Sequence, residues 1–200
     1  MSGRPEAGAR GDTLRLTGGK ARGRRLKGPR AGLIRPTGER VREALFDILG
    51  LRVQGARFLD VYSGTGAVGC EALSRGAAQA ILLERDRDAL RLIGENLRLA
   101  PWSGTGRLIA GDACRSLREL ARRRAIFDVI FLDPPYDAPD LSAALGLAGR
   151  ILSSEGVLVL EHRSTSENAL PETTFLDRAR TYRYGDSSLT VYRPAGGPGR

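Results

Sequence analysis

Short apolar runs alternate with amphipathic segments through the middle of the chain. The apolar runs predict strands, and the segments with apolar residues three or four positions apart predict helices. The expected strands are Phe58–Tyr62, Ala80–Glu84, Arg107–Ala110, Phe127–Leu132 and Val157–Glu161. The expected helices are Ala67–Arg75, Arg87–Leu99, Cys114–Arg123 and Leu141–Ile151. Repeated strand–helix units predict an α/β domain with a parallel sheet and helices on both faces.

The two ends of the chain have a different pattern. Thr13–Thr17 and Arg24–Lys27 predict a small hairpin around Gly18-Gly19-Lys20, and Thr37 is the expected N-cap of a helix that runs to Leu49. Near the C-terminus, Thr173–Tyr184 and Ser187–Arg193 predict an antiparallel hairpin on the sheet edge. The whole is therefore expected to be a seven-stranded, mostly parallel, Rossmann-like sheet with a C-terminal antiparallel hairpin. A small N-terminal β-hairpin and helix extend it.

Composition divides the chain further. Residues 1–12 are rich in Gly, Ala and Arg, a composition that predicts a disordered leader. Residues 194–200 are expected to form a flexible tail. Residues 13–50 form the expected extension and 51–193 the expected core. Of the 200 residues, 41% are hydrophobic, which suits a globular domain.

The positive charge is concentrated at one end. Residues 1–42 hold twelve basic and three acidic residues, so their net charge of +9 equals that of the whole chain. A neutral body with a basic segment predicts a polyanionic partner. From residue 13 the bases alternate with apolar residues, which favours a packed nucleic-acid-binding surface over a solvated tail. The bases expected to contact phosphates are Arg15, Lys20, Arg22, Arg24, Arg25 and Arg35.

Several classes are disfavoured by what the sequence lacks. It has no apolar run of about 18 residues and no apolar stretch behind the basic N-terminus, so no membrane partner or secretory signal is expected. Cys70, Cys114 and His162 are too few for a zinc site, so no metal is expected. The cysteines are expected to be buried and His162 to be structural or at the rim. A cytoplasmic monomer is the default expectation.

A glycine loop follows the first expected strand of the core. Gly64-x-Gly66-x-x-Gly69 matches a nucleotide-binding fingerprint, stands after a strand and opens a helix. Taken alone, this match favours NAD and S-adenosylmethionine equally. Glu84 ends the next strand, where a carboxylate accepts the hydroxyls of an adenosine ribose in either cofactor.

Two further acids separate these alternatives. Asp60 precedes the glycines, where it would repel the pyrophosphate of NAD but attract the ammonium and sulfonium of S-adenosylmethionine. Asp112 lies just past the third strand and offers an acceptor to the adenine amine. Three acids at the carboxyl ends of three parallel strands favour a S-adenosylmethionine site over unrelated loop carboxylates.

The fourth strand leads directly into Asp133-Pro134-Pro135-Tyr136. The prolines remove two N–H donors and stiffen the backbone. The Asp133 carboxylate and the Pro134 carbonyl suit the two hydrogens of an exocyclic amine, and Tyr136 suits stacking on a base. This predicts direct methyl transfer to an amine through alignment, without a covalent enzyme intermediate. It leaves adenine N6, guanine N2 and a protein amide open.

With these motifs the chain resembles class I S-adenosylmethionine-dependent methyltransferases that modify exocyclic amines. Leu14–Leu26, Arg35–Phe46, Glu71–Ala77 and Tyr184-Gly185-Asp186 narrow the resemblance to the RsmD family. The resemblance implies N2 methylation of a guanine, guanine 966 of 16S ribosomal RNA, in free RNA or in the assembling 30S subunit. It implies Asp133, Pro134 and Tyr136 at the target amine. Around the cofactor it implies Asp60, Gly64, Gly66, Glu84, Asp112 and Ala113.

Two other hypotheses remain open at this point. An adenine-N6 nucleic-acid methyltransferase shares the Asp133 loop, but only about 40 residues here lie outside the catalytic core for a separate target-recognition segment. A non-catalytic RNA-binding assembly factor on a methyltransferase fold is disfavoured by the intact glycine loop and Asp133.

Overall fold

The computed structural model describes residues 13–28, 38–99, 104–136 and 138–196, and it confirms the Rossmann-like α/β fold. The main sheet has seven strands in the order β5-β4-β3-β6-β7-β9-β8. Its strands are β3 (Arg57–Val61), β4 (Gln79–Glu84), β5 (Gly106–Ala110), β6 (Phe127–Leu132), β7 (Leu152–Arg163), β8 (Leu176–Tyr184) and β9 (Ser187–Pro194). The first five run parallel, and β9 and β8 add an antiparallel edge.

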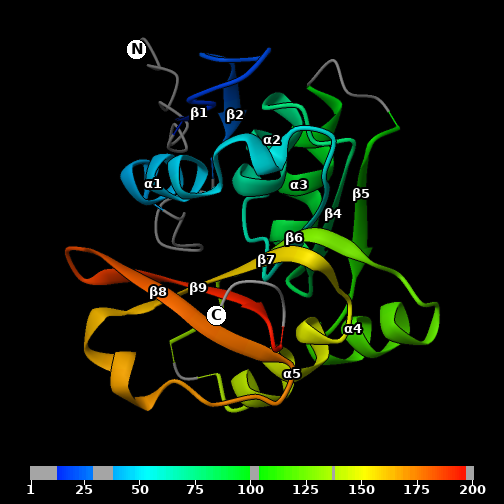
Figure 1. Cartoon of the computed structure of the whole chain (residues 1–200). Coiled ribbons are helices and arrows are strands. Elements are labelled where there is room, and N and C mark those ends of the chain that lie inside the picture. The colour runs from blue at the N-terminus through cyan, green and yellow to red at the C-terminus, as the bar shows by residue number, and fades with distance from the viewer. Residues whose placement is uncertain (1–12, 29–37, 100–103, 137, 197–200) are drawn as a thin grey trace, which may run out of the picture.

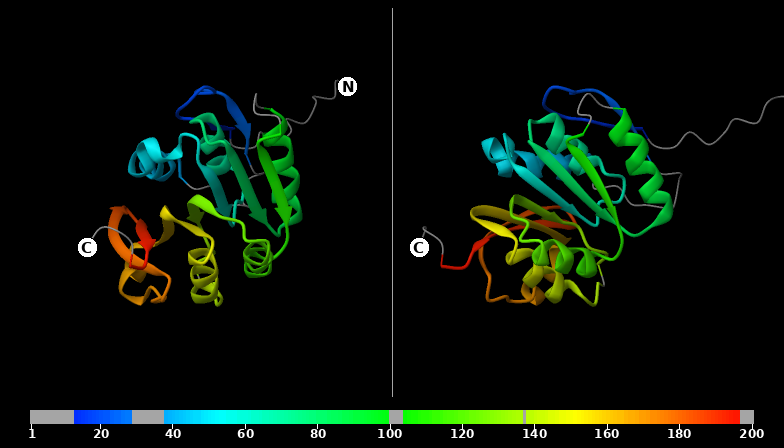
Figure 2. Two further views of the ribbon diagram at one scale, coloured as in Figure 1. Left: turned by 45° about the vertical axis from the view of Figure 1, so that its right-hand side comes forward. Right: turned by 90° about the vertical axis from the view of Figure 1, so that its right-hand side faces the viewer.

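Helices cover both faces of this sheet (Figure 1). One layer contains α1 (Glu39–Leu49), α2 (Ala67–Ser74) and α3 (Arg87–Arg98). The other contains α4 (Ala113–Arg122) and α5 (Leu141–Gly149). Figure 2 shows the hairpin of β8 and β9 at the sheet edge, away from β5.

The order of the strands fixes where a ligand binds. From β3 the chain moves outward to β4 and β5, and then crosses back to place β6 on the other side of β3. In an open parallel sheet, such a reversal leaves a crevice at the carboxyl ends of the two strands concerned. The predicted cofactor loop follows β3 and the predicted catalytic loop follows β6, so both lie at this crevice.

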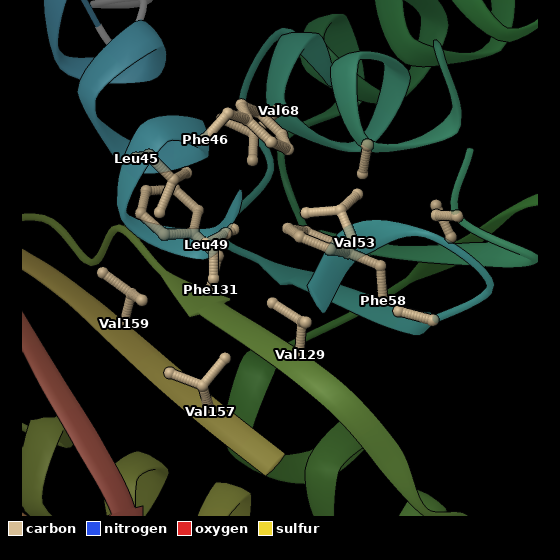
Figure 3. Close-up of a cluster of buried hydrophobic side chains, with 14 of the residues drawn as sticks. Leu45, Phe46, Leu49, Val53, Phe58, Val68, Val129, Phe131, Val157 and Val159 are labelled. Atoms are coloured by element: carbon tan, nitrogen blue, oxygen red, sulfur yellow. The ribbon is translucent and has the colours of Figure 1, made fainter. Parts of the chain in front are cut away.

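Two hydrophobic cores sandwich the sheet. Figure 3 shows the core under α1, where Leu45, Phe46 and Leu49 pack toward Phe58 on β3 and Phe131 on β6. The opposite core lies under α4 and α5. Helix α1 therefore contributes buried side chains to the central core, although it belongs to the segment expected to extend from it.

The predicted N-terminal hairpin forms as β1 (Thr13–Arg15) and β2 (Arg25–Lys27). Leu16 and Leu26 are buried against α2, beside Ala67 and Cys70. The main anchor is Glu71 of α2, which is also buried. Its carboxylate accepts hydrogen bonds from the amides of Thr17 (2.9 Å) and Gly18 (2.7 Å) and lies 3.5 Å from Nε of the buried Arg42.

Most predicted elements are correct to within two residues, and four predictions need correction. The first strand was predicted to reach Thr17 but ends at Arg15, because the Thr17 amide bonds to Glu71 instead of a neighbouring strand. Tyr62 was placed in a strand but has a left-handed φ of 65°. β7 begins at Leu152 rather than Val157, with a register shift opposite Phe127–Val129, and β8 begins at Leu176 rather than Thr173.

Some predictions fall outside the described residues. These are the leader 1–12, the phosphate contact at Arg35, the cap at Thr37 and the end of the tail at 197–200. Within the described part, α1 begins at Glu39 with Gly38 in the N-cap position. No helix among the described residues is long and apolar enough to cross a membrane.

Candidate active site

The loop after β3 turns sharply at the crevice. Gly64 and Gly66 have φ values of 53° and 73°, which favour glycine. A Cβ on Gly66 would also lie 3.0 Å from Ile93 Cγ1 and 3.1 Å from Leu82 Cδ2. The backbone thus closes tightly and leads into α2, as the glycine motif predicts.

Asp60 lies beneath this loop and is buried. Its Oδ2 accepts a 2.9 Å hydrogen bond from the amide of Gly69 in the first turn of α2. The pKa of Asp60 is raised to about 7, chiefly by burial and in smaller part by the nearby charges of Asp133 and Glu84, against the lowering effect of the Gly69 hydrogen bond. A cationic ligand in the crevice would favour the ionised carboxylate.

Glu84 ends β4 on the other side of the loop. Its Oε2 accepts from the Gly64 amide (2.8 Å), and its Oε1 accepts from the amides of Arg85 (2.7 Å) and Asp86 (2.9 Å). These contacts fix the carboxylate at the crevice and hold the glycine loop to the next strand. Oε2 retains acceptor capacity, because a carboxylate has about two lone-pair sites on each oxygen and the Gly64 amide uses only one of those on Oε2.

Asp112 follows β5 and is the N-cap of α4. Its Oδ1 accepts a 2.9 Å hydrogen bond from the Arg115 amide. Capping is the structural role that such a position commonly has. Asp112 and Ala113 also line the cavity at the crevice. The cap therefore holds the start of α4 beside the ligand site.

The loop Asp133–Tyr136 follows β6 directly. The Asp133 amide donates to the Val61 carbonyl at 3.3 Å, which joins this loop to the strand that carries Asp60. Pro134 is buried, whereas Tyr136 is half-buried, with the Arg163 guanidinium carbon 4.2 Å from its ring centroid. The two predicted halves of the site are thus bonded across adjacent strands.

One cavity of about 1040 Å³ unites these residues. It brings together all the predicted cofactor and catalytic residues except Gly66: Asp60, Gly64, Glu84, Asp112, Ala113, Asp133, Pro134 and Tyr136. Gly66 is absent from its lining and acts in the turn behind it.

Sequence reasoning missed two residues that line the same cavity. Tyr62 combines a positive φ with a buried hydroxyl, and burial raises its pKa. Its strand-like surroundings gave no sign of this backbone conformation. Glu161 lies on β7 and is 6% exposed. The sequence did carry a signal for Glu161, since this acid ends an apolar run as Glu84 and Asp133 do.

The structure describes five of the six residues that are expected to contact phosphates. Arg15, Lys20, Arg22, Arg24 and Arg25 are exposed along the hairpin, while the neighbouring Leu16 and Leu26 are buried. Gly38 and Val41, at the start of α1, line the cavity. The hairpin therefore packs on α2 and α3, and the start of α1 contributes to the cavity.

The remaining candidates have structural roles. Cys70 and Cys114 are both free and buried, as expected. His162 is buried too, with Nε2 2.8 Å from Thr190 Oγ1 and Nδ1 2.7 Å from the Arg163 carbonyl oxygen. Among the described residues no group of His, Cys, Asp and Glu is arranged to hold a metal ion.

These features fit S-adenosylmethionine better than a dinucleotide. A buried acid with a raised pKa stands where NAD would present a pyrophosphate, and it gains by pairing with an ammonium or sulfonium. The fold and the site define a Rossmann-like class I S-adenosylmethionine-dependent methyltransferase.

Comparison with known proteins carries the identification further. The chain belongs to the RsmD family, whose model, described as conserved hypothetical protein 95, matches residues 14–193. It is 36% identical to YlbH of Bacillus subtilis (strain 168), over 92% of this chain and 100% of that protein. It is also 36% identical to Ribosomal RNA small subunit methyltransferase D of Escherichia coli (strain K12), over 79% of this chain and 78% of that protein. The solved structure of yhhF from Escherichia coli superposes with a TM-score of 0.79 at 32% identity, covering 92% of this chain and 98% of that one.

Proposed function

We propose that this protein methylates the exocyclic N2 amine of a guanine in small-subunit ribosomal RNA. The relatives named as ribosomal RNA methyltransferases support an RNA substrate. The observation that carries the proposal is the single cavity shared by the cofactor residues and the Asp133 loop. Guanine 966 of 16S RNA is the position that the family resemblance suggests.

The loop after β6 would hold the amine. The Asp133 carboxylate and the Pro134 carbonyl accept its two hydrogens, and Tyr136 stacks on the base. S-adenosylmethionine, when bound, supplies an electrophilic methyl group on its sulfonium. The guanine N2 lone pair forms the new N–C bond as the S–C bond breaks, and its electron pair stays on sulfur.

Positive charge then develops on N2, and the two acceptors bind it more tightly than they bind the neutral amine. The proton leaves through Asp133 or water after the methyl has transferred. Alignment supplies most of the rate gain, because no covalent enzyme intermediate forms.

The guanine has to leave its stack to reach Asp133, which costs least in an RNA loop. The exposed bases of the hairpin, Arg15 to Arg25, would hold the surrounding phosphates. All of them are exposed within one short hairpin, so together they would contact several phosphates.

The direct test is transfer of a tritiated methyl group to immature small subunits, followed by nucleoside mass analysis. We expect N2-methylguanosine from the wild type, and a loss of at least about 100-fold in rate with Asp133→Ala or Asp133→Asn. Asp128→Asn is a matched control, since this acid is on β6 but binds the Arg57 amide on the surface. N6-methyladenosine as the product, or full activity in both Asp133 variants, would contradict the proposal.

A further inference from the structure

Glu161 and Asp133 occupy equivalent places on neighbouring strands. β6 and β7 pair in parallel with Leu132 opposite Leu160, and each acid is the next residue along its strand. Phe131 and Val159, two residues before each acid, both pack in the core under α1. Because side chains alternate along a strand, Asp133 and Glu161 face the same side of the sheet, and both line the cavity.

Glu161 lies away from the cofactor half of that cavity. The residues assigned to the cofactor come from β3, β4 and β5, whereas β7 is on the far side of β6. The cavity is also lined by Tyr184, Asp186 and Ser187, where β8 turns into β9, and β9 is the strand that pairs with β7 on the side away from β6. This is the part left for the target base once the amine is at Asp133.

The chemistry of the bases gives this carboxylate a role. In guanine, one of the two ring nitrogens beside the amine is N1, which carries a hydrogen and is a donor. In adenine and cytosine, the ring nitrogen beside the amine is an acceptor. An ionised carboxylate can only accept hydrogen bonds. It therefore attracts the N1–H of guanine and repels the ring-nitrogen lone pair of adenine or cytosine.

We propose that Glu161 selects guanine by accepting a hydrogen bond from N1–H while Asp133 holds the N2 amine. This inference rests on the proposed function and names the residue that sets its base specificity. Glu161 is 6% exposed, and a charged hydrogen bond is stronger in a site shielded from water. An adenine amine placed at Asp133 would set its N1 lone pair against this carboxylate, which accounts for discrimination between bases that both offer an amine.

The test compares guanine with 2-aminopurine at the mapped position of the ribosomal RNA, introduced by ligation. 2-Aminopurine keeps the amine at C2 but has no hydrogen on N1. We expect wild-type kcat/KM for guanine to exceed that for 2-aminopurine by about 100-fold. Glu161→Gln should lower kcat/KM for guanine by about 10- to 100-fold. Its amide N–H pairs with N1 of 2-aminopurine, so the ratio between the bases should fall by at least about tenfold.

Two controls separate recognition from structure. Glu155→Gln makes the same change on the exposed first half of β7 and should leave both rates unchanged. Calorimetric binding of S-adenosylmethionine should be the same in wild type and Glu161→Gln, since Glu161 is outside the cofactor half.

The outcomes are distinct. A wild type that methylates both bases equally overturns the inference and needs no variant to do so, even if Glu161→Gln does not fold. A Glu161→Gln variant that keeps the wild-type ratio also overturns it. A wild type that produces no methylated guanine contradicts the proposed function instead.

Discussion

The guanidinium carbon of Arg163 lies 4.2 Å from the centroid of the Tyr136 ring. This cation–π contact covers one face of the ring from the end of β7 and restricts how the ring turns. Only the opposite face of the Tyr136 ring is then open to a stacking base. We call this open face the stacking platform.

Removing the Tyr136 stacking platform should lower kcat/KM for the RNA substrate but leave the affinity for S-adenosylmethionine unchanged. Because stacking of one base on an aromatic ring is worth about 1–3 kcal/mol, Tyr136→Ala should lower kcat/KM by about 10- to 100-fold. Tyr136→Phe keeps the ring and should stay within about threefold of the wild type. Single-turnover methylation measures this. If Phe were as poor as Ala, the hydroxyl rather than the ring would be the important group.

Cofactor affinity should depend on pH through Asp60. Its pKa of about 7 means that the carboxyl is largely protonated at pH 6 and ionised at pH 8, and a cationic cofactor pairs with the ionised form. The Kd for S-adenosylmethionine should therefore rise by about tenfold from pH 8 to pH 6. Calorimetry at both pH values measures it. Asp60→Asn should remove most of this slope, and because the cofactor amine titrates identically with both proteins, an unchanged slope would exclude Asp60 as its source.

The anchor at Glu71 should dominate the stability of the N-terminal segment. Glu71→Ala leaves the buried Arg42 guanidinium without its anion and the Thr17 and Gly18 amides without their acceptor. Loss of one partner of a buried ion pair costs about 3–5 kcal/mol in the free energy of unfolding. Urea denaturation measures the loss. In a double-mutant cycle with Arg42→Met, the combined loss should be smaller than the sum of the single losses; simple additivity would show that the two charges do not interact.

RNA binding should be sensitive to salt through the hairpin. Arg24 and Arg25 are exposed beside the buried Leu26, and each is expected to neutralise one phosphate. Replacing both by Gln should reduce the slope of log Kd against log salt by about 1.5 to 2, with no change in base preference. Filter binding from 50 to 300 mM salt tests this. The matched control is Arg122→Gln with Arg123→Gln, two exposed residues at the end of α4, and an equal effect there would point to general charge instead of the hairpin.

The order of strands and helices could be predicted from sequence because apolar runs alternate with amphipathic segments, and Gly, Pro or acidic residues lie at or near the ends of several elements. Long-range contacts could not. The end of β1 depends on Glu71, 54 positions beyond Thr17, and the length of β7 depends on its pairing with β6 and β9. Neither partner is visible in a local pattern.

The site shows the same division. Asp60, Glu84, Asp112 and Asp133 could be found because each lies at or just past the carboxyl end of a strand, and parallel strands bring such residues to one edge. Glu161 obeys the same rule, but the sequence assigned no chemistry to it until β7 was seen beside β6. Tyr62 could not have been found, because its left-handed backbone is set by the tight closure of the loop onto β4 rather than by its own preference.

The bond between the Asp133 amide and the Val61 carbonyl has a consequence for how this enzyme tolerates change. Asp60 and Asp133 belong to adjacent strands whose register decides which face each side chain occupies. A single-residue insertion or deletion within Phe127–Leu132 would shift Asp133 to the opposite face, under α4 and α5, while leaving the hydrophobic character of the strand intact. The active site should thus tolerate many side-chain substitutions in β6 but not a change in the length of this strand. Sequence divergence within β6 should therefore proceed by substitution alone.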